Sequence, residues 1–146
     1  MTPTFSHLGI CVSDLERSLC FYRDGLGFEP VMSHRVGEEF GALMELDGLE
    51  LESQMLARDG VMIELLAFER PAAVGDGHRR PMNQLGLTHL SLRVDDIDAV
   101  AGRIERFGGK VVPTTRTPIG ADSSRLEFVY CTDPDGVRIE LMDLPG

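Results

Sequence analysis

A six-residue strand pattern occurs twice in the chain, and it limits the possible folds more than any other feature. The sequence GVMIEL at residues 60–65 returns as GVRIEL at residues 136–141, with only the third residue changed. An aspartate precedes each copy, as expected for a tight Asp-Gly turn that leads into a β-strand. A repeated strand with a glutamate at a fixed place, Glu64 or Glu140, predicts a duplicated module.

A second strand pattern opens each half of the chain. Residues 5–12 and 87–94 alternate between two faces, and each segment carries one histidine, His7 or His89. Gly9 and Ser91 lie two residues beyond these histidines on the same face, where they leave room for a ligand.

A helix is predicted after each of these first strands. Residues 13–16 have the form of a capping box that begins at Ser13, and Asp95 can cap the second helix. Apolar residues then follow at helical spacing until glycines end the pattern at residues 25–27 and 108–109.

The remaining segments complete two copies of a β-α-β-β-β module. We therefore expect one α+β domain over residues 1–146, with modules at about 5–68 and 87–143, a connector at 69–86, and strands that curve around a metal-binding cleft. The other predicted elements are strands at 28–36, 49–58, 60–68, 110–115, 126–132 and from 136, a short helix at 38–46 and a loop at 118–124.

The composition narrows the classes of partner. A formal charge of -10 repels phosphate backbones and anionic membranes, so neither nucleic acid nor membrane is expected as a partner. The three cysteines are odd in number and far apart, which argues against a disulfide framework and favours a reducing, cytoplasmic location. The N-terminal residues show no leader pattern, and there is no apolar run of bilayer length.

The residues that carry chemistry are two histidines and two glutamates. A single histidine or glutamate on a strand is usually a packing or solvated residue, but here each half contributes one of each at matching places. Glu64 shares its strand face with Met62 and Leu66, and a carboxylate in apolar company needs a partner. Two imidazoles and two carboxylates suit a divalent Ni, Co, Mn, Fe or Zn ion, so the predicted metal ligands are His7, Glu64, His89 and Glu140.

Four segments of the chain resemble the vicinal oxygen chelate superfamily, which includes glyoxalase I, methylmalonyl-CoA epimerase, extradiol dioxygenases and the bleomycin and fosfomycin resistance proteins. The superfamily's metal positions fall on the four residues named above. The matching segments are HLGICV at 7–12 with LGF at 26–28, GVMIEL at 60–65, HLSLRVDD at 89–96 and DPDGVRIEL at 133–141.

The resemblance implies a metal-dependent lyase or isomerase of the glyoxalase or epimerase type. One divalent ion would polarise a small substrate with neighbouring oxygens, and Glu140 or Glu64 would move a proton through a metal-bound enediolate. In the epimerases an additional base would be sought near Glu45. The alternatives are an Fe(II)-dependent extradiol-type dioxygenase and a non-enzymatic protein that binds a drug or metabolite.

Several residues and the assembly state complete the hypothesis. Arg93 and Arg125 are candidate contacts for an anionic substrate, whereas His34, His78 and the Arg79-Arg80 pair are interpreted as ordinary surface or loop residues. The resemblance implies a homodimer. The four ligands could come from one chain or from two.

Overall fold

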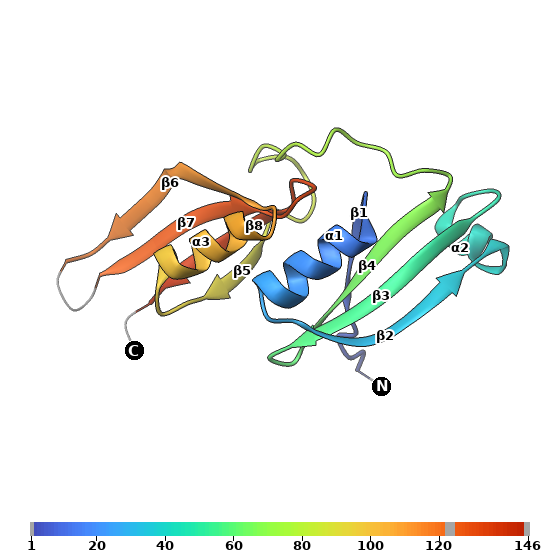
Figure 1. Ribbon diagram of the computed structural model, residues 1–146, viewed down its shortest axis with the longest axis horizontal. Helices are drawn as coiled ribbons and strands as arrows, with labels where there is room; N and C mark the ends of the chain where they lie inside the picture. Colours follow the sequence, from blue (N-terminus) through green and yellow to red (C-terminus); the bar gives the residue numbers. More distant parts are fainter. Residues whose placement is uncertain (1, 122–124, 145–146) are drawn as a thin grey trace. The chain divides into compact units, whose positions relative to one another are not determined.

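The computed structural model describes residues 2–121 and 125–144, and they form two compact units, which divide between residues 75 and 76. Each unit contains a four-stranded mixed sheet with one longer helix against one face (Figure 1). The element order in both units follows the β-α-β-β-β pattern predicted from the repeat. The predicted α+β class and the duplicated module are therefore confirmed.

The first unit builds its sheet in the order β1-β4-β3-β2. Strand β1 pairs parallel with β4, and the other neighbours are antiparallel. A short helical segment, predicted at residues 38–46, is present between β2 and β3. The elements are β1 (Leu8–Val12), α1 (Leu15–Cys20) with a π-helical turn (Phe21–Gly25), β2 (Glu29–Val36), a 3-10 turn (Glu38–Phe40), α2 (Gly41–Met44), β3 (Glu50–Arg58) and β4 (Val61–Arg70).

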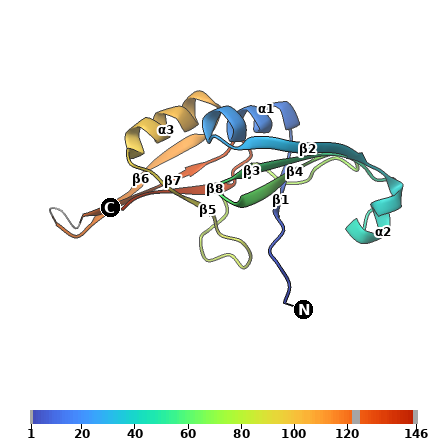
Figure 2. The ribbon, with the colours of Figure 1, turned by 90° about the horizontal axis from the view of Figure 1, so that it is seen from below.

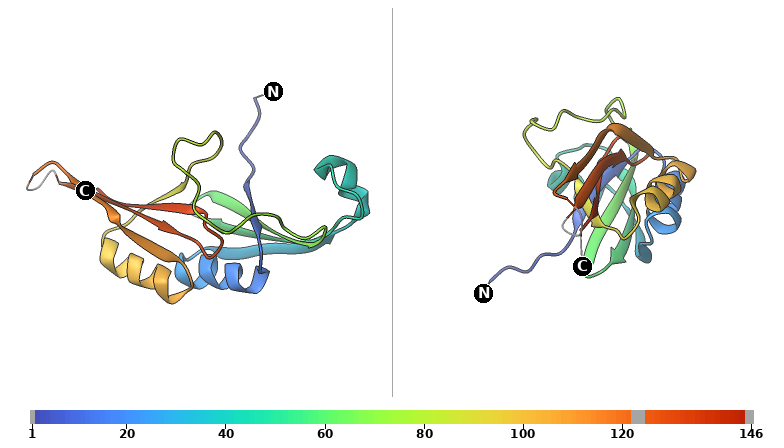
Figure 3. Two further views of the ribbon diagram at one scale, coloured as in Figure 1. Left: turned by 90° about the horizontal axis from the view of Figure 1, so that it is seen from above. Right: turned by 90° about the vertical axis from the view of Figure 1, so that its left-hand side faces the viewer.

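The two faces of the first sheet differ in what covers them. Ile63 and Leu65 of β4 are fully buried on the face covered by α1, and burying each such side chain contributes about 1.5–3 kcal/mol. Figures 2 and 3 show α2 on the opposite side from α1, at one end of the sheet. There it covers a small cluster of Val36, Leu49 and Leu51. The rest of that opposite face, here called the open face of the first unit, carries Glu64.

The second unit repeats this plan with the strand order β5-β8-β7-β6. Ile139 and Leu141 of β8 are fully buried together with Ile104 of the helix, so Glu140 between them lies on the opposite face, here called the open face of the second unit. The elements are β5 (Leu90–Arg93), α3 (Ile97–Arg106), β6 (Lys110–Ile119), β7 (Leu126–Thr132) and β8 (Arg138–Asp143).

Both predicted helix caps are wrong by one residue. The carboxylate of Asp14, not the hydroxyl of Ser13, accepts the backbone N–H of Arg17, and the carboxylate of Asp96, not that of Asp95, accepts the N–H of Ala99. In each case the residue in the extended conformation directly before the helix caps it, because only that position aims its side chain at the free N–H groups of the first turn.

Some strand limits also differ from the expectation. The first strands of the two units begin at Leu8 and Leu90, so both histidines lie just before their strands. Strand β6 continues to Ile119 and takes up the start of the predicted loop at 118–124, of which residues 122–124 lie outside the described part of the chain.

The predicted connector at residues 69–86 is divided between the two units. Its first residues belong to β4, which ends at Arg70, and residues from 76 onward pack within the second unit. The main-chain oxygen of Arg80 accepts a hydrogen bond from Arg138 Nη2 at 2.7 Å. A Cβ atom on Gly136 would lie 2.5 Å from the carbonyl oxygen of Gly77, so glycine there permits a close approach of the two backbones.

Candidate functional site

The first unit brings one predicted histidine and one predicted glutamate together. His7 Nε2 lies 3.2 Å from Glu64 Oε2. The contact forms because His7 directly precedes β1, which pairs with β4 and sets Gly9 opposite Glu64. The carboxylate side chain is only 17% exposed, so it lies in the partly apolar setting that the strand parity predicted.

The second unit repeats the arrangement. His89 Nε2 lies 3.5 Å from Glu140 Oε2, and the parallel pairing of β5 with β8 sets Ser91 opposite Glu140. The Glu140 side chain is also 17% exposed. Two matched His–Glu pairs therefore result from the duplicated module, one on each open face.

In both imidazoles the Nδ1 atom lies within hydrogen-bond distance of a hydroxyl group. Ser6 Oγ lies 2.9 Å from His7 Nδ1, and Thr88 Oγ1 lies 3.0 Å from His89 Nδ1. When Nδ1–H donates to the hydroxyl, Nε2 presents its lone pair toward the glutamate side, which is the tautomer that a metal ligand needs. Both hydroxyls were missed in the sequence, although each belongs to the residue directly before the histidine.

Serine hydroxyls donate to both carboxylates, but from different strands. Ser53 Oγ on β3 lies 2.5 Å from Glu64 Oε1, and Ser91 Oγ on β5 lies 2.8 Å from Glu140 Oε2. Gly9 stands in the first unit where Ser91 stands in the second, so the hydroxyl for Glu64 has to come from elsewhere. Ser91, expected to leave room for a ligand, also donates a hydrogen bond to Glu140.

Two further side chains complete the open face of the second unit. The Tyr130 ring contacts His89 with a centroid distance of 5.6 Å, and the Arg138 guanidinium lies 4.9 Å from the centroid of the same ring. Burial raises the pKa of the Tyr130 phenol, and the charge of Glu140 and a hydrogen bond to it add to this rise. Burial and the nearby charge of Arg79 lower the pKa of Arg138.

The geometry of each pair fits a divalent metal ion. Two ligand atoms at about 2.1 Å from one ion stand roughly 3.0–3.4 Å apart at octahedral to tetrahedral angles, close to the two Nε2–Oε2 distances. Imidazole with carboxylate suits Zn, Mn, Fe, Co and Ni. Among residues 2–121 and 125–144 no group of three or more His, Cys, Asp or Glu is gathered at one point, so each unit brings together two of the predicted ligands.

The other predicted site residues have contacts of their own. Arg93 Nη2 is 3.4 Å from the carbonyl oxygen of Leu144, and Arg125 Nη2 is 3.4 Å from Glu127 Oε1, a carboxylate that also binds Arg116. Glu45 is exposed at the end of α2 with a left-handed φ of 57°.

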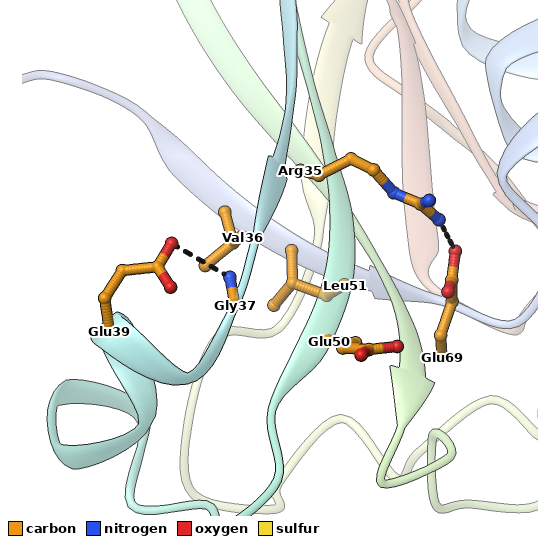
Figure 4. A pocket seen from close by; sticks show the side chains of 7 residues that line it. All are labelled: Arg35, Val36, Gly37, Glu39, Glu50, Leu51 and Glu69. Atoms are coloured by element: carbon orange, nitrogen blue, oxygen red, sulfur yellow. Dashed lines mark hydrogen bonds and ion pairs between the residues drawn. The ribbon is translucent and has the colours of Figure 1, made fainter.

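A surface hollow of about 340 Å³ lies elsewhere on the first unit (Figure 4). Arg35 pairs with Glu69 across β2 and β4, and Glu39 and Glu50 are two further carboxylates in the lining, so the hollow is acidic on balance. None of the predicted site residues lines it. The lining residues are Arg35, Val36, Gly37, Glu39, Glu50, Leu51 and Glu69.

The described residues contain no helix that is both long and apolar enough to cross a membrane.

Comparison with protein families gives one match over most of the chain. The family model described as Glyoxalase/Bleomycin resistance protein/Dioxygenase superfamily matches residues 4–141. That span includes both His–Glu pairs.

Three curated proteins are similar over nearly their whole length. An uncharacterized protein of Escherichia coli, YaeR, is 32% identical over 94% of this chain and 93% of its own. An ethylmalonyl-CoA/methylmalonyl-CoA epimerase of Cereibacter sphaeroides is 27% identical, covering 97% and 98%. A "Probable lactoylglutathione lyase" of Vibrio parahaemolyticus is 28% identical, covering 93% and 87%.

Solved structures share the fold. A glyoxalase family protein from Bacillus cereus superimposes with a TM-score of 0.84 and 23% identity over 100% of this chain and 97% of its own. The fosfomycin resistance protein FosX from Listeria monocytogenes, crystallised with Mn(II) and sulfate, gives a TM-score of 0.59 and 16% identity over 98% and 93%.

Proposed function

The chain belongs to the Glyoxalase/Bleomycin resistance protein/Dioxygenase superfamily, and we propose that it is a metal-dependent lyase or isomerase of the glyoxalase or epimerase type. Its substrate would be a small molecule with neighbouring oxygen atoms. The proposal rests on one observation above all, the pairing of an oriented imidazole with a serine-held carboxylate in both units.

In this proposal His7, Glu64, His89 and Glu140 hold one divalent ion, with the two pairs supplied either by one chain or by two chains of a homodimer. We also propose that both units act as a single domain. A divalent ion held there would polarise a substrate oxygen and make a neighbouring C–H bond more acidic.

The protein groups then carry out the proton transfer. The carboxylate of Glu64 or Glu140 accepts the proton on its Oε atom and returns it to a neighbouring carbon or to the opposite face. Ser53 and Ser91 keep the carboxylates in position.

The relatives support this class of reaction, because one curated relative is named as an epimerase and another as a lyase. The three cysteines, odd in number and far apart in the sequence, support the proposal that the protein acts in a reducing compartment such as a cytoplasm.

Metal content is the first test. Protein purified without chelator and without an affinity-tag metal is analysed for elements beside the Glu64→Gln and His89→Ala variants. About one Ni, Co, Mn or Zn per chain, lost in the variants, supports the proposal and leads to proton-exchange assays on 2-oxo and 2-hydroxy compounds. Iron at this level with oxygen uptake would favour the dioxygenase, and no affinity for any metal would leave a binding protein.

A further inference from the structure

The two copies of the repeated strand differ at one position, and the difference changes a charge. Met62 occupies this position in β4 and Arg138 in β8, each two residues before the glutamate and therefore on the same face as it. The open face of the second unit thus has a guanidinium beside its His–Glu pair, where the first unit has a thioether.

Arg138 is almost completely buried, with 8% of the residue exposed. Its Nη2 donates to the carbonyl oxygen of Arg80 at 2.7 Å, and its guanidinium lies 4.9 Å from the centroid of the Tyr130 ring. The same ring contacts His89 on β5 and its hydroxyl binds Glu140. Arg138 is therefore part of the surroundings of the His–Glu pair.

No carboxylate within residues 2–121 and 125–144 forms an ion pair with Arg138. Exposed arginines of this acidic chain do have such partners, as Arg116 has in Asp98 and Glu127. The nearby charged group is instead Arg79, another cation.

The Tyr130 ring and the Arg80 carbonyl stabilise this guanidinium, but neither supplies a counter-charge. A buried charge is normally paired, because desolvation without a counter-charge costs several kcal/mol per ion. A guanidinium has five N–H donors in a planar fork that matches a carboxylate or a phosphate group. Only one of these donors has a protein acceptor in the hydrogen bonds described here.

We propose that Arg138 binds an anionic group of the substrate, a carboxylate or phosphate, beside the His89–Glu140 pair. This inference rests on the proposed function and names the chemical class of its substrate. Arg138 joins Arg93 and Arg125 as a candidate for this role, and Arg125 differs from it in having an ion-pair partner, Glu127.

The test follows the side-chain Nε–Hε signal of Arg138 by NMR in the full chain with one equivalent of Zn(II). Inorganic phosphate and acetate are titrated separately at low ionic strength. We expect a saturable shift of the Arg138 signal, and the anion that binds more tightly identifies the substrate group. In Arg138→Met, with Tyr130 and His89 as reporters, the affinity should fall at least tenfold. Arg103→Met, on the exposed side of α3, makes the same change of charge and should bind as the unchanged chain does.

Two results would overturn the inference. One is the absence of a saturable shift at Arg138 in the unchanged chain, together with faster amide exchange over residues 76–89 in Arg138→Met. Arg138 would then have only a structural role, which is to anchor residues 76–89. The other is an unchanged phosphate affinity in Arg138→Met, which would place the anion on the zinc or elsewhere.

Further readouts separate folding and metal binding from anion recognition. Arg138→Lys keeps the charge but removes the planar pair of N–H donors, and it is the test variant if Arg138→Met fails to fold. Partial retention of phosphate binding in the lysine variant supports the inference. Full retention contradicts a bidentate contact of the guanidinium with the anion. The His89 imidazole signals report zinc binding independently. A chain that binds zinc but no anion contradicts only the inference, whereas a chain that binds phosphate at Arg138 but no zinc contradicts the proposed metal site.

Discussion

The Nε2 atom of His7 lies 3.2 Å from Glu64 Oε2, which joins the segment before β1 to the middle of β4. Residues 57 positions apart in the chain meet because β1 and β4 are parallel neighbours, although β4 is the last strand of its unit. His89 and Glu140 meet in the same way through β5 and β8. The proposed ligands are thus brought together by strand order within each unit.

Removing the serine that holds a carboxylate should weaken metal binding. In Ser53→Ala and Ser91→Ala, Glu64 and Glu140 lose a charge-assisted hydrogen bond, and we expect metal affinity to fall about 10- to 100-fold. Competition with a chelator of known affinity measures this. Ser33→Ala, on the exposed strand β2, is the matched control, and equal losses in all three variants would rule out a positioning role.

The hydroxyls beside the histidines should have a similar effect. Thr88→Val keeps the shape of the side chain but removes the partner of His89 Nδ1, so both tautomers become available. We expect roughly a tenfold loss of metal affinity and a change in the tautomer shown by the imidazole ¹⁵N shifts. Thr114→Val on β6 serves as the control, and an unchanged tautomer would contradict the assignment.

Two glycines at matching turns should respond differently to alanine. Gly60 and Gly136 both have a positive φ, 78° and 88°, but a Cβ atom meets nothing within 4 Å at Gly60 and meets the Gly77 carbonyl at 2.5 Å at Gly136. Gly60→Ala should cost about 1–2 kcal/mol of unfolding free energy from strain alone. Gly136→Ala should cost roughly 2–4 kcal/mol, because the backbone at residues 77–78 must also move.

Urea unfolding gives both values, and amide exchange locates the change. Faster exchange over residues 76–80 should accompany Gly136→Ala alone. Equal destabilisation by the two substitutions would show that the close approach to residue 77 has no energetic weight.

The ion pairs of Arg116 should make part of the stability depend on acid pH. Hydrogen bonds from Arg116 lower the pKa of Asp98 and Glu127 below their ordinary values of 3.8 and 4.5. A lowered pKa in the folded state contributes stability above the ordinary value, and this contribution is lost as pH falls through the lowered value. Melting temperatures measured from about pH 6 down to pH 3 should therefore fall less steeply in Arg116→Met. Parallel curves for the two proteins would contradict this.

The sequence was sufficient for the fold class and for the pairing within each unit, since strand period and repeat place one histidine and one glutamate on a common face. The helix caps could not be assigned, because Ser13 and Asp14, like Asp95 and Asp96, are adjacent residues with equal capping chemistry. Backbone direction at the strand end decides between them.

The contacts of Ser53, Tyr130 and Arg138 depend on cross-strand neighbours on β3, β7 and β8, which sequence spacing within one strand does not reveal. The contact of Arg125 is a local one, because its Nη2 lies 3.4 Å from Oε1 of Glu127, two residues further along the chain.

Glu64 receives its hydroxyl from β3 and Glu140 receives its hydroxyl from β5, so the two carboxylates are approached from opposite neighbouring strands. The duplication thus preserves what the carboxylate needs and not the residue that supplies it. An alignment of the halves sets Gly9 against Ser91 and would count the serine as lost. The two units therefore match in the hydrogen bond that each glutamate receives, whereas the serines that donate it are found only by comparing spatial neighbours and not by aligning the two sequence repeats.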